Sequence, residues 1–258
     1  MIPGIDCSHW QDDKSTPQKM DFKKAKDAGA QFVFIKVSER GGIDRDFEYN
    51  WKAAKDAGLL RGGYHFLRWT LSGLTQARIF CDIMKEDPGE LPPVADFEAP
   101  NFGDVHPSNA LLQQFLEEVE TIENEIPILY TSPGYWNIHG KNKVTKQHDP
   151  KWKYYPLWIA HYTKANKPTI PNPWEDWLFW QYTAKGDGHK YGAESKSIDL
   201  NWFNGDLTDL FVLAGQGQVH PPDQPGGPSN NPDFNLRLTA FHERIKSLEN
   251  WAREIGLK

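Results

Sequence analysis

The segment PVADFE, residues 93–98, is a short apolar run that ends in two acidic residues, and seven comparable runs occur before residue 204. The other seven are Gly4–Ser8, Phe32–Ser38, Gly62–Leu67, Ile128–Thr131, Leu157–Tyr162, Leu178–Thr183 and Ser197–Phe203. Short β-branched or aromatic runs that alternate with amphipathic stretches are typical of βα units around a parallel sheet. The sequence therefore predicts an α/β fold with eight strands.

Helical patterns fill the earlier gaps between these runs, whereas the later gaps have the composition of loops. The predicted helices are Phe22–Ala28, Phe47–Ala57, Leu74–Lys85 and Ala110–Ile122. Because the helices are confined to the first half, we expect an irregular, TIM-like β/α barrel. In such barrels the active site lies at the C-terminal ends of the strands.

The C-terminal region differs in composition from the predicted barrel. Residues 217–232 are rich in Pro, Gly and Asn, which predicts a linker between a barrel over residues 1–216 and a C-terminal amphipathic helix over residues 233–258. The apolar positions of that helix follow a heptad pattern, and they are Phe234, Leu238, Phe241, Ile245, Leu248, Ala252 and Ile255. A lone helix of this length is marginal in water. It therefore docks on its own barrel, or it mediates self-association or partner docking through residues 234–255.

Composition excludes several classes of protein. The net charge of −6 provides no basic stripe for nucleic acid, and no run of residues is long and apolar enough for a membrane span. Cys7 and Cys81 are too few for a disulfide framework. The chain contains 11 Trp and 9 Tyr, more than a core requires, and such rings often form stacking platforms for sugars.

Asp96 and Glu98 are the strongest candidates for catalysis. Residues two apart in a strand point to the same face, so both carboxylates are expected to project together. Like charges held close together raise at least one carboxyl pKa, which provides a proton donor beside a group that can stay ionised. Glycosidic cleavage requires such a pair. The alternative interpretation is a strand-end turn or a salt bridge to a nearby Lys or Arg.

Further candidates depend on closure of the barrel. Asp6 ends the first run and Asp199 lies in the last, and the first and last strands of a closed barrel are neighbours. The acids of these strands are then expected to converge with Asp96 and Glu98. Candidate sugar-binding residues at strand positions are Tyr64, Tyr130, Trp158, Tyr162, Trp180 and Gln181, although each could instead fill the core.

Other chemistries lack their sequence patterns. The nine His residues show no zinc-ligand spacing, and the chain contains no Gly-x-Ser-x-Gly elbow, phosphate loop or dinucleotide fingerprint. We therefore expect neither a metal nor a cofactor.

Taken together, eight motifs resemble the family-25 glycoside hydrolases, the lysozymes of the Chalaropsis type, over about residues 3–213. The motifs are DCS at 6–8, FIKVSE at 34–39, GYHF at 63–66, DFE at 96–98, LYT at 129–131, WIAHY at 158–162, WQYT at 180–183 and IDLN at 198–201. The resemblance implies an irregular barrel of five β/α units plus three β-strands. It also implies hydrolysis of the β-1,4 bond between N-acetylmuramic acid and N-acetylglucosamine in bacterial peptidoglycan.

The same resemblance assigns roles to the four acids. Glu98 would be the general acid and Asp96 its carboxylate partner, with Asp6 and Asp199 as supporting acids and net retention of configuration. Whether Asp96 attacks the sugar or steadies an intermediate formed by the substrate's acetamido group stays open. The linker and the C-terminal helix lie outside the resemblance.

Two other functions are compatible with parts of the sequence. One is a chitinase-like hydrolase, although the longer Asp-x-x-Asp-x-Asp-x-Glu pattern is missing. The other is a non-catalytic carbohydrate-binding or structural module tethered through the C-terminal helix. For a muramidase we expect action at the cell wall, outside the cell. The absence of a recognisable signal peptide suggests either an endolysin with phage-type release or a bacterial autolysin whose leader has been trimmed.

Overall fold

The computed structural model describes residues 1–12, 15–16, 19–99 and 105–215. It divides into two units, Met1–Asn204 and Gly205–Lys258. In the second unit the described residues form one helix, α6 (Leu207–Leu213), which begins with a capping box between Asp206 and Asp209. The predicted linker and C-terminal helix lie outside the described residues.

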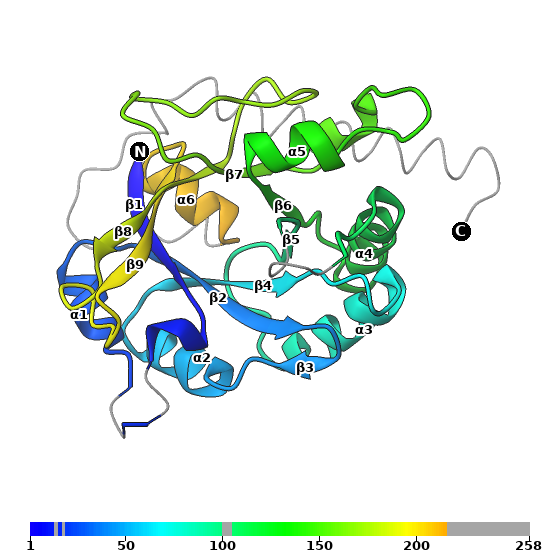
Figure 1. Ribbon diagram of the computed structural model, residues 1–258. Helices are drawn as coiled ribbons and strands as arrows, with labels where there is room; N and C mark the ends of the chain where they lie inside the picture. The colour runs from blue at the N-terminus through cyan, green and yellow to red at the C-terminus, as the bar shows by residue number, and fades with distance from the viewer. Residues whose placement is uncertain (13–14, 17–18, 100–104, 216–258) are drawn as a thin grey trace. The chain divides into compact units, whose positions relative to one another are not determined.

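Eight strands of the first unit form a closed barrel, which confirms the expected fold class (Figure 1). The barrel strands are β1 (Ile2–Cys7), β2 (Phe32–Glu39), β4 (Leu60–Phe66), β5 (Val94–Asp96), β6 (Ile128–Thr131), β7 (Leu157–Ala160), β8 (Phe179–Asp187) and β9 (Ser197–Phe203). Strand β1 closes the barrel because it pairs with β2 on one side and with β9 on the other. The short strand β3 (Gly42–Ile43) pairs with the end of β2.

Five helices surround the strands and connect the first six of them (Figure 1). They are α1 (Phe22–Asp27), α2 (Phe47–Asp56), α3 (Gly73–Met84), α4 (Asn109–Glu123) and α5 (Pro133–His139). Helices α3, α4 and α5 each begin after a serine whose hydroxyl accepts a hydrogen bond from a backbone amide of the first turn. No α-helix separates β7, β8 and β9, so the barrel consists of five β/α units followed by three strands.

Three details differ from the sequence-based expectation. Strand β9 is antiparallel to both of its neighbours, so the sheet is not entirely parallel. The gap after β6 contains α5 and the 3₁₀-helix η2 (Pro150–Tyr154), although its composition predicts a loop. Ser132 caps α5, and Pro133 is accommodated at its first turn, where a missing N–H costs nothing. Strand β5 ends at Asp96, so Glu98 lies just beyond the strand.

Aromatic rings fill the interior of the barrel below its C-terminal mouth. Phe34 stacks on Trp158 at a centroid distance of 4.4 Å, and Phe179 contacts Phe32 at 5.0 Å. Glycines on neighbouring strands make room for these rings. A Cβ atom on Gly62 would lie 2.3 Å from the ring of Phe34. The packed interior holds the strands in the register that positions the residues at the mouth.

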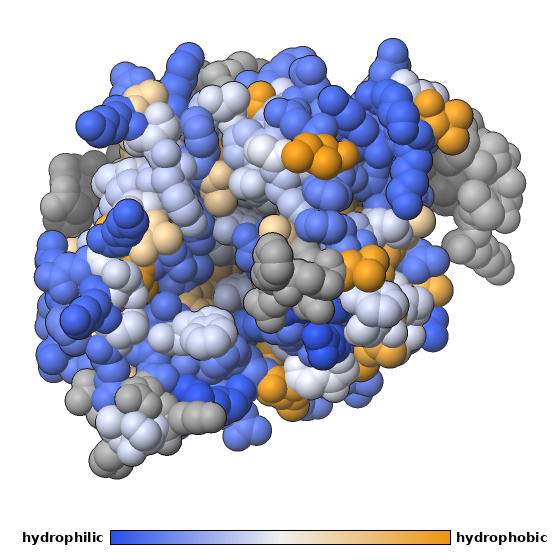
Figure 2. Space-filling view, in the orientation of Figure 1, coloured by the Kyte–Doolittle hydropathy of each residue, from blue (hydrophilic) through white to orange (hydrophobic). Residues whose placement is uncertain are grey.

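The described residues on the face shown in Figure 2 are mostly polar. On the face shown in Figure 2, hydrophobic residues form separate spots rather than one continuous patch. Within the described part of the chain, no helix combines the length and the apolar character that crossing a bilayer requires.

We predict that Gly62→Ala lowers the free energy of unfolding by about 1–3 kcal/mol, because the added methyl group overpacks the ring of Phe34. Thermal denaturation followed by circular dichroism measures the change. Gly134→Ala is the matched control, since a Cβ atom at Gly134 in α5 meets nothing within 4 Å. A melting temperature of Gly62→Ala equal to that of the wild type would contradict the packing argument.

Candidate active site

A polar cleft of about 590 Å³ opens at the C-terminal ends of the barrel strands. It is lined by Asp6, Cys7, Ser8, His9, Trp10, Gln11, Lys36, Glu39, Tyr64, Phe66, Arg68, Asp96, Glu98, Ala99, Tyr130, Trp158, Tyr162, Gln181, Ala184 and Asp199. All four acids singled out in the sequence lie in this one cleft. Closure of the barrel thus brings together residues from both ends of the first unit.

Asp6 and Asp199 lie opposite each other on the paired strands β1 and β9. Asp6 Oδ2 accepts hydrogen bonds from Gln181 Nε2 at 2.9 Å and from Asn201 Nδ2 at 2.7 Å. Burial raises the pKa of Asp6 to about 6, although these two hydrogen bonds oppose the rise. Burial, followed by the charges of Asp6 and Glu98, raises the pKa of Asp199 to about 8.

Asp96 and Glu98 form the second part of the acidic cluster. Asp96 is 6% exposed, and its buried Oδ1 atom accepts no hydrogen bond from the described residues. Burial and then the charge of Glu98 raise the pKa of Asp96 well above its usual range. Burial and then the charge of Asp6 raise the pKa of Glu98 to about 7. The pair therefore retains a proton near neutral pH, as acid catalysis requires.

Basic side chains limit this rise in pKa. Glu39 is held between Lys36 Nζ at 2.5 Å and Arg68 Nη2 at 2.7 Å. The positive charge of Lys36 lowers the pKa of both Asp96 and Glu98, and that of Arg68 lowers the pKa of Glu98. Lys36 and Arg68 carry two positive charges and Glu39 one negative charge. Together these three residues offset part of the negative charge in the cleft.

The polar atoms of one wall form a continuous hydrogen-bond network. The hydroxyl groups of Tyr130 and Tyr162 donate to Gln181 Oε1 at 3.0 and 2.7 Å. Trp158 Nε1 donates to Asn201 Oδ1 at 2.9 Å, and the amides of both Gln181 and Asn201 donate to Asp6. The network fixes these side chains, since each amide is oriented by both its donor and its acceptor atoms.

The structure brings five of the six predicted sugar-binding residues to the cleft, and the exception is Trp180. Trp180 is 4% exposed, its Nε1 atom donates to His161 O at 2.9 Å, and its ring contacts Trp177. Adjacent strand residues face opposite sides, so Trp180 points away where Gln181 points into the cleft. This alternation was available in the sequence, and the prediction for Trp180 is corrected accordingly.

Trp10 is a cleft residue that the sequence analysis did not single out. It is 74% exposed and lies on the 3₁₀-helix η1 (His9–Gln11). Ser8 and Gln11 form a capping box around η1, and His9 Nδ1 lies 2.6 Å from Asp44 Oδ2. The spacing of Ser8 and Gln11 was the available signal. Lys36, Glu39 and Arg68 carried no comparable signal, since their meeting depends on the fold.

Among the described residues, no three His, Cys, Asp or Glu side chains are arranged so that they could hold a metal ion. The cleft contains carboxyl groups with raised pKa values beside the exposed rings of Trp10 and Tyr162. Such a combination suits acid-catalysed cleavage of a bound saccharide.

Comparisons with known proteins agree with this geometry. The model of glycosyl hydrolases family 25 matches residues 5–190. Lysozyme M1 of Streptomyces globisporus is 30% identical over 230 residues, which cover 83% of this chain and 71% of that protein. The N,O-diacetylmuramidase of Chalaropsis sp. is 26% identical, with 83% and 99% covered. The structure of a muramidase from Acremonium alcalophilum is 30% identical with a TM-score of 0.67, covering 84% of this chain and all of that one.

We predict that Asp199→Asn stabilises the protein more at pH 8 than at pH 4. Between these values the unfolded chain releases the Asp199 proton, whereas the folded protein retains it because its pKa is about 8. Stability therefore falls as the pH rises through this window, and the amide removes that loss. Asp199 is partly exposed, so we expect a difference of roughly 1–2 kcal/mol.

Differential scanning calorimetry at the two pH values measures this difference as a shift in Tm of a few degrees. Asp82→Asn, on the exposed face of α3, is the control for loss of one carboxyl group outside the cleft. An equal effect of Asp199→Asn at both pH values would show that the Asp199 carboxyl is not perturbed.

Proposed function

Because this chain belongs to glycosyl hydrolase family 25, we propose that it is a lysozyme that hydrolyses the β-1,4 bond between N-acetylmuramic acid and N-acetylglucosamine in peptidoglycan. The observation that carries the proposal is the cluster of four carboxyl groups in one cleft at the mouth of the barrel. A chitinase-like hydrolase and a non-catalytic module are less favoured, since the named relatives are lysozymes and muramidases.

Glu98 is the proposed general acid. Its pKa of about 7 leaves a large protonated fraction at neutral pH, and it lies beyond the end of β5, where it borders the cleft. A protonated carboxyl group there can donate to the glycosidic oxygen as the bond to the leaving sugar breaks. The charge of Asp6 helps Glu98 to retain its proton.

Asp96 is the proposed carboxylate partner. Its side chain lines the cleft, and its buried Oδ1 atom has no hydrogen-bond donor among the described residues. When Asp96 is ionised, its carboxylate can stabilise positive charge at the sugar carbon, by direct attack or by supporting the substrate's own acetamido group. The nearby ammonium group of Lys36 favours the ionised form of Asp96.

Asp6 and Asp199 are proposed as supporting acids, and the cleft walls as the sugar-binding surface. The charge of Asp6 raises the electrostatic cost of ionising Glu98 and Asp199. The proposed substrate-binding residues are Tyr64, Tyr130, Trp158, Tyr162 and Gln181, together with Trp10. Trp10 and Tyr162 are 74% and 58% exposed, so their rings can stack on sugars without rearrangement of the core.

The domain organisation and cellular location are part of the same proposal. A catalytic domain over residues 1–216 would act on the cell wall from outside the cell. A linker over residues 217–232 would connect it to a helix over residues 233–258, whose heptad pattern supports self-association or partner docking.

We predict that Glu98→Gln lowers the rate of peptidoglycan hydrolysis by at least about 100-fold, because the amide cannot donate the catalytic proton. Release of reducing ends from purified peptidoglycan measures the rate, and mass spectrometry of the products identifies the bond that is cut. Wild-type products that end in reducing N-acetylmuramic acid support the proposal.

Glu48→Gln, on α2, is the control for loss of one negative charge and should retain full activity. Circular dichroism should show an intact fold for both variants. Substantial activity of Glu98→Gln would show that Glu98 is not the general acid. Hydrolysis of chitin but not of peptidoglycan would show that the substrate is chitin.

We also predict that the full chain has a larger molar mass in solution than its calculated 29.6 kDa, and that a chain ending at residue 216 is a monomer. The physical reason is the apolar heptad stripe, which can bury its surface against the stripe of a second copy. Light scattering measures both masses. A monomeric full chain would exclude self-association.

A further inference from the structure

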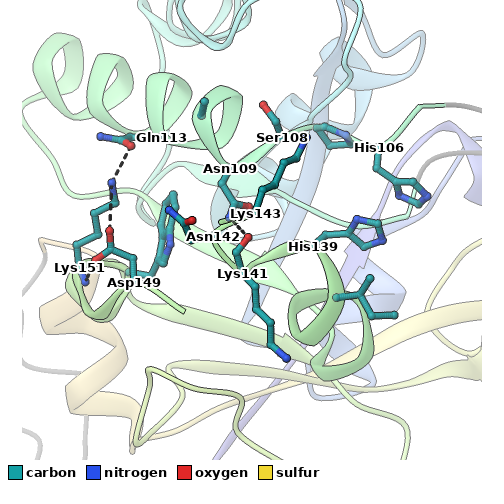
Figure 3. Close-up of a pocket in the computed structure, with 14 residues that line it drawn as sticks. His106, Ser108, Asn109, Gln113, His139, Lys141, Asn142, Lys143, Asp149 and Lys151 are labelled. Atoms are coloured by element: carbon teal, nitrogen blue, oxygen red, sulfur yellow. Dashed lines mark hydrogen bonds and ion pairs between the residues drawn. The ribbon is translucent and has the colours of Figure 1, made fainter. Parts of the chain in front are cut away.

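A second cavity lies outside the barrel, between the start of α4 and the end of α5 (Figure 3). It encloses about 570 Å³ and shares no lining residue with the acidic cleft. Its lining residues are His106, Pro107, Ser108, Asn109, Ala110, Gln113, Ile138, His139, Lys141, Asn142, Lys143, Asp149, Lys151 and Trp152. The cavity is thus comparable in size with the proposed active site, but none of the chemistry above uses it.

The charge of this cavity is opposite to that of the cleft. It contains three lysines and one acid, Asp149, which lies 3.7 Å from Lys151 Nζ. Lys141 and Lys143 have no ion-pair partner among the described residues. In Figure 3, Lys143 reaches across the cavity toward Ser108, whereas Lys141 extends away from it. In a chain with a net charge of −6, this local positive charge favours an anionic ligand.

The cavity also provides a buried hydrogen-bond acceptor. Asn109 Nδ2 donates to Lys141 O at 3.1 Å, but the buried Oδ1 atom of Asn109 accepts no hydrogen bond from the described residues. The same cavity is lined by the rings of His106 and His139, which stack at a centroid distance of 4.1 Å. A suitable ligand therefore carries both negative charge and N–H donors. Peptides with free carboxylates meet both requirements, whereas inorganic phosphate would occupy a small part of the volume.

A chain of ring contacts connects this cavity to the segment that carries Asp96 and Glu98. Phe97, between Asp96 and Glu98, contacts Tyr135 on α5 at a centroid distance of 5.1 Å. Tyr135 in turn stacks on His139 at 4.4 Å. The cavity therefore adjoins the outer side of the same wall whose inner side presents Asp96.

We propose that this cavity binds the acidic peptide stem that peptidoglycan carries on its muramic acid units. The proposal rests on the proposed function for the identity of the substrate, since a glycan held beside Asp96 must direct its peptides over the protein surface. Lys143 holds a carboxylate of the stem, and Asn109 Oδ1 accepts a peptide N–H. The cavity thereby favours peptide-bearing glycan over bare glycan.

Lys143→Gln tests the kinetic part of the proposal. The rate of hydrolysis is compared on intact peptidoglycan and on glycan strands from which an amidase has removed the peptides. We expect Lys143→Gln to lower kcat/KM on intact peptidoglycan roughly threefold and to leave the rate on stripped glycan unchanged. Lys143→Arg should restore the preference. Lys146→Gln, on the same loop but outside the cavity, is the matched control and should behave as the wild type.

A binding experiment separates failure of this proposal from failure of the proposed function. Stem peptides released from peptidoglycan are titrated into the full-length protein, and the imidazole resonances of His106 and His139 are followed by NMR. We expect shifts that saturate with the peptide, weaken in Lys143→Gln, and are absent with inorganic phosphate or with peptides whose carboxylates are amidated.

Equal rates of wild type and Lys143→Gln on both substrates, with no saturable shifts, would overturn the peptide site while leaving hydrolysis intact. Saturable shifts in a protein that cuts neither substrate would preserve the acidic-peptide site and refute the proposed function. If inorganic phosphate, but not the stem peptide, caused saturable shifts of the imidazole resonances, the cavity would bind a simple anion, and the proposal would be overturned.

Discussion

The pairing of β1 with two strands is the constraint on which the cleft depends. Strand β1 is parallel to β2 and antiparallel to β9, and this closes the barrel. The register places Asp6 opposite Asp199, and closure also brings Asn201 of β9 and Gln181 of β8 within hydrogen-bond distance of Asp6. These side chains come from opposite ends of the first unit in sequence. Closure of the barrel brings them close enough for each charge to change the pKa of its neighbours. An open sheet would leave the first and last of these acids in water, with no reason for their pKa values to rise.

Gathering four carboxyl groups in one cleft reduces the stability of the fold at neutral pH. Burial is the largest cause of the raised pKa in every case, and neighbouring acids add to it for Asp96, Glu98 and Asp199. The aromatic interior below the mouth offsets this cost, since its rings pack closely and hold the strands in register. Lys36 and the amides around Asp6 reduce the penalty further without removing it. Burial and repulsion between the acids outweigh these stabilising contacts, so carboxyl groups in the cleft retain protons where a glycosidase needs an acid.

Strand β5 separates two different environments. Asp96 faces the negative cleft inside the barrel, and Phe97 faces the aromatic contacts of α5 outside it. Phe97 follows the last residue of β5, and its backbone N–H still donates to Tyr130 O at 2.9 Å, so the side chains of Asp96 and Phe97 point to opposite faces as adjacent strand residues do. Because the strand ends at Asp96, Glu98 borders the cleft from the segment beyond it. The cationic cavity next to α5 therefore lies on the outer side of the wall that presents the acids.

Local patterns in the sequence determined the eight strands, the first four helices and the position of the acids at strand ends, because periodicity and composition act over a few neighbouring residues. They also predicted that Asp96 and Glu98 project to one side, and they supplied the motifs of the family. The antiparallel direction of β9 and the presence of α5 were decided by the tertiary structure. The same holds for the meeting of Lys36 with Glu39 and Arg68, the exposure of Trp10 and the cavity around Lys143. Each of these depends on register or on contacts between distant segments, which no local pattern contains.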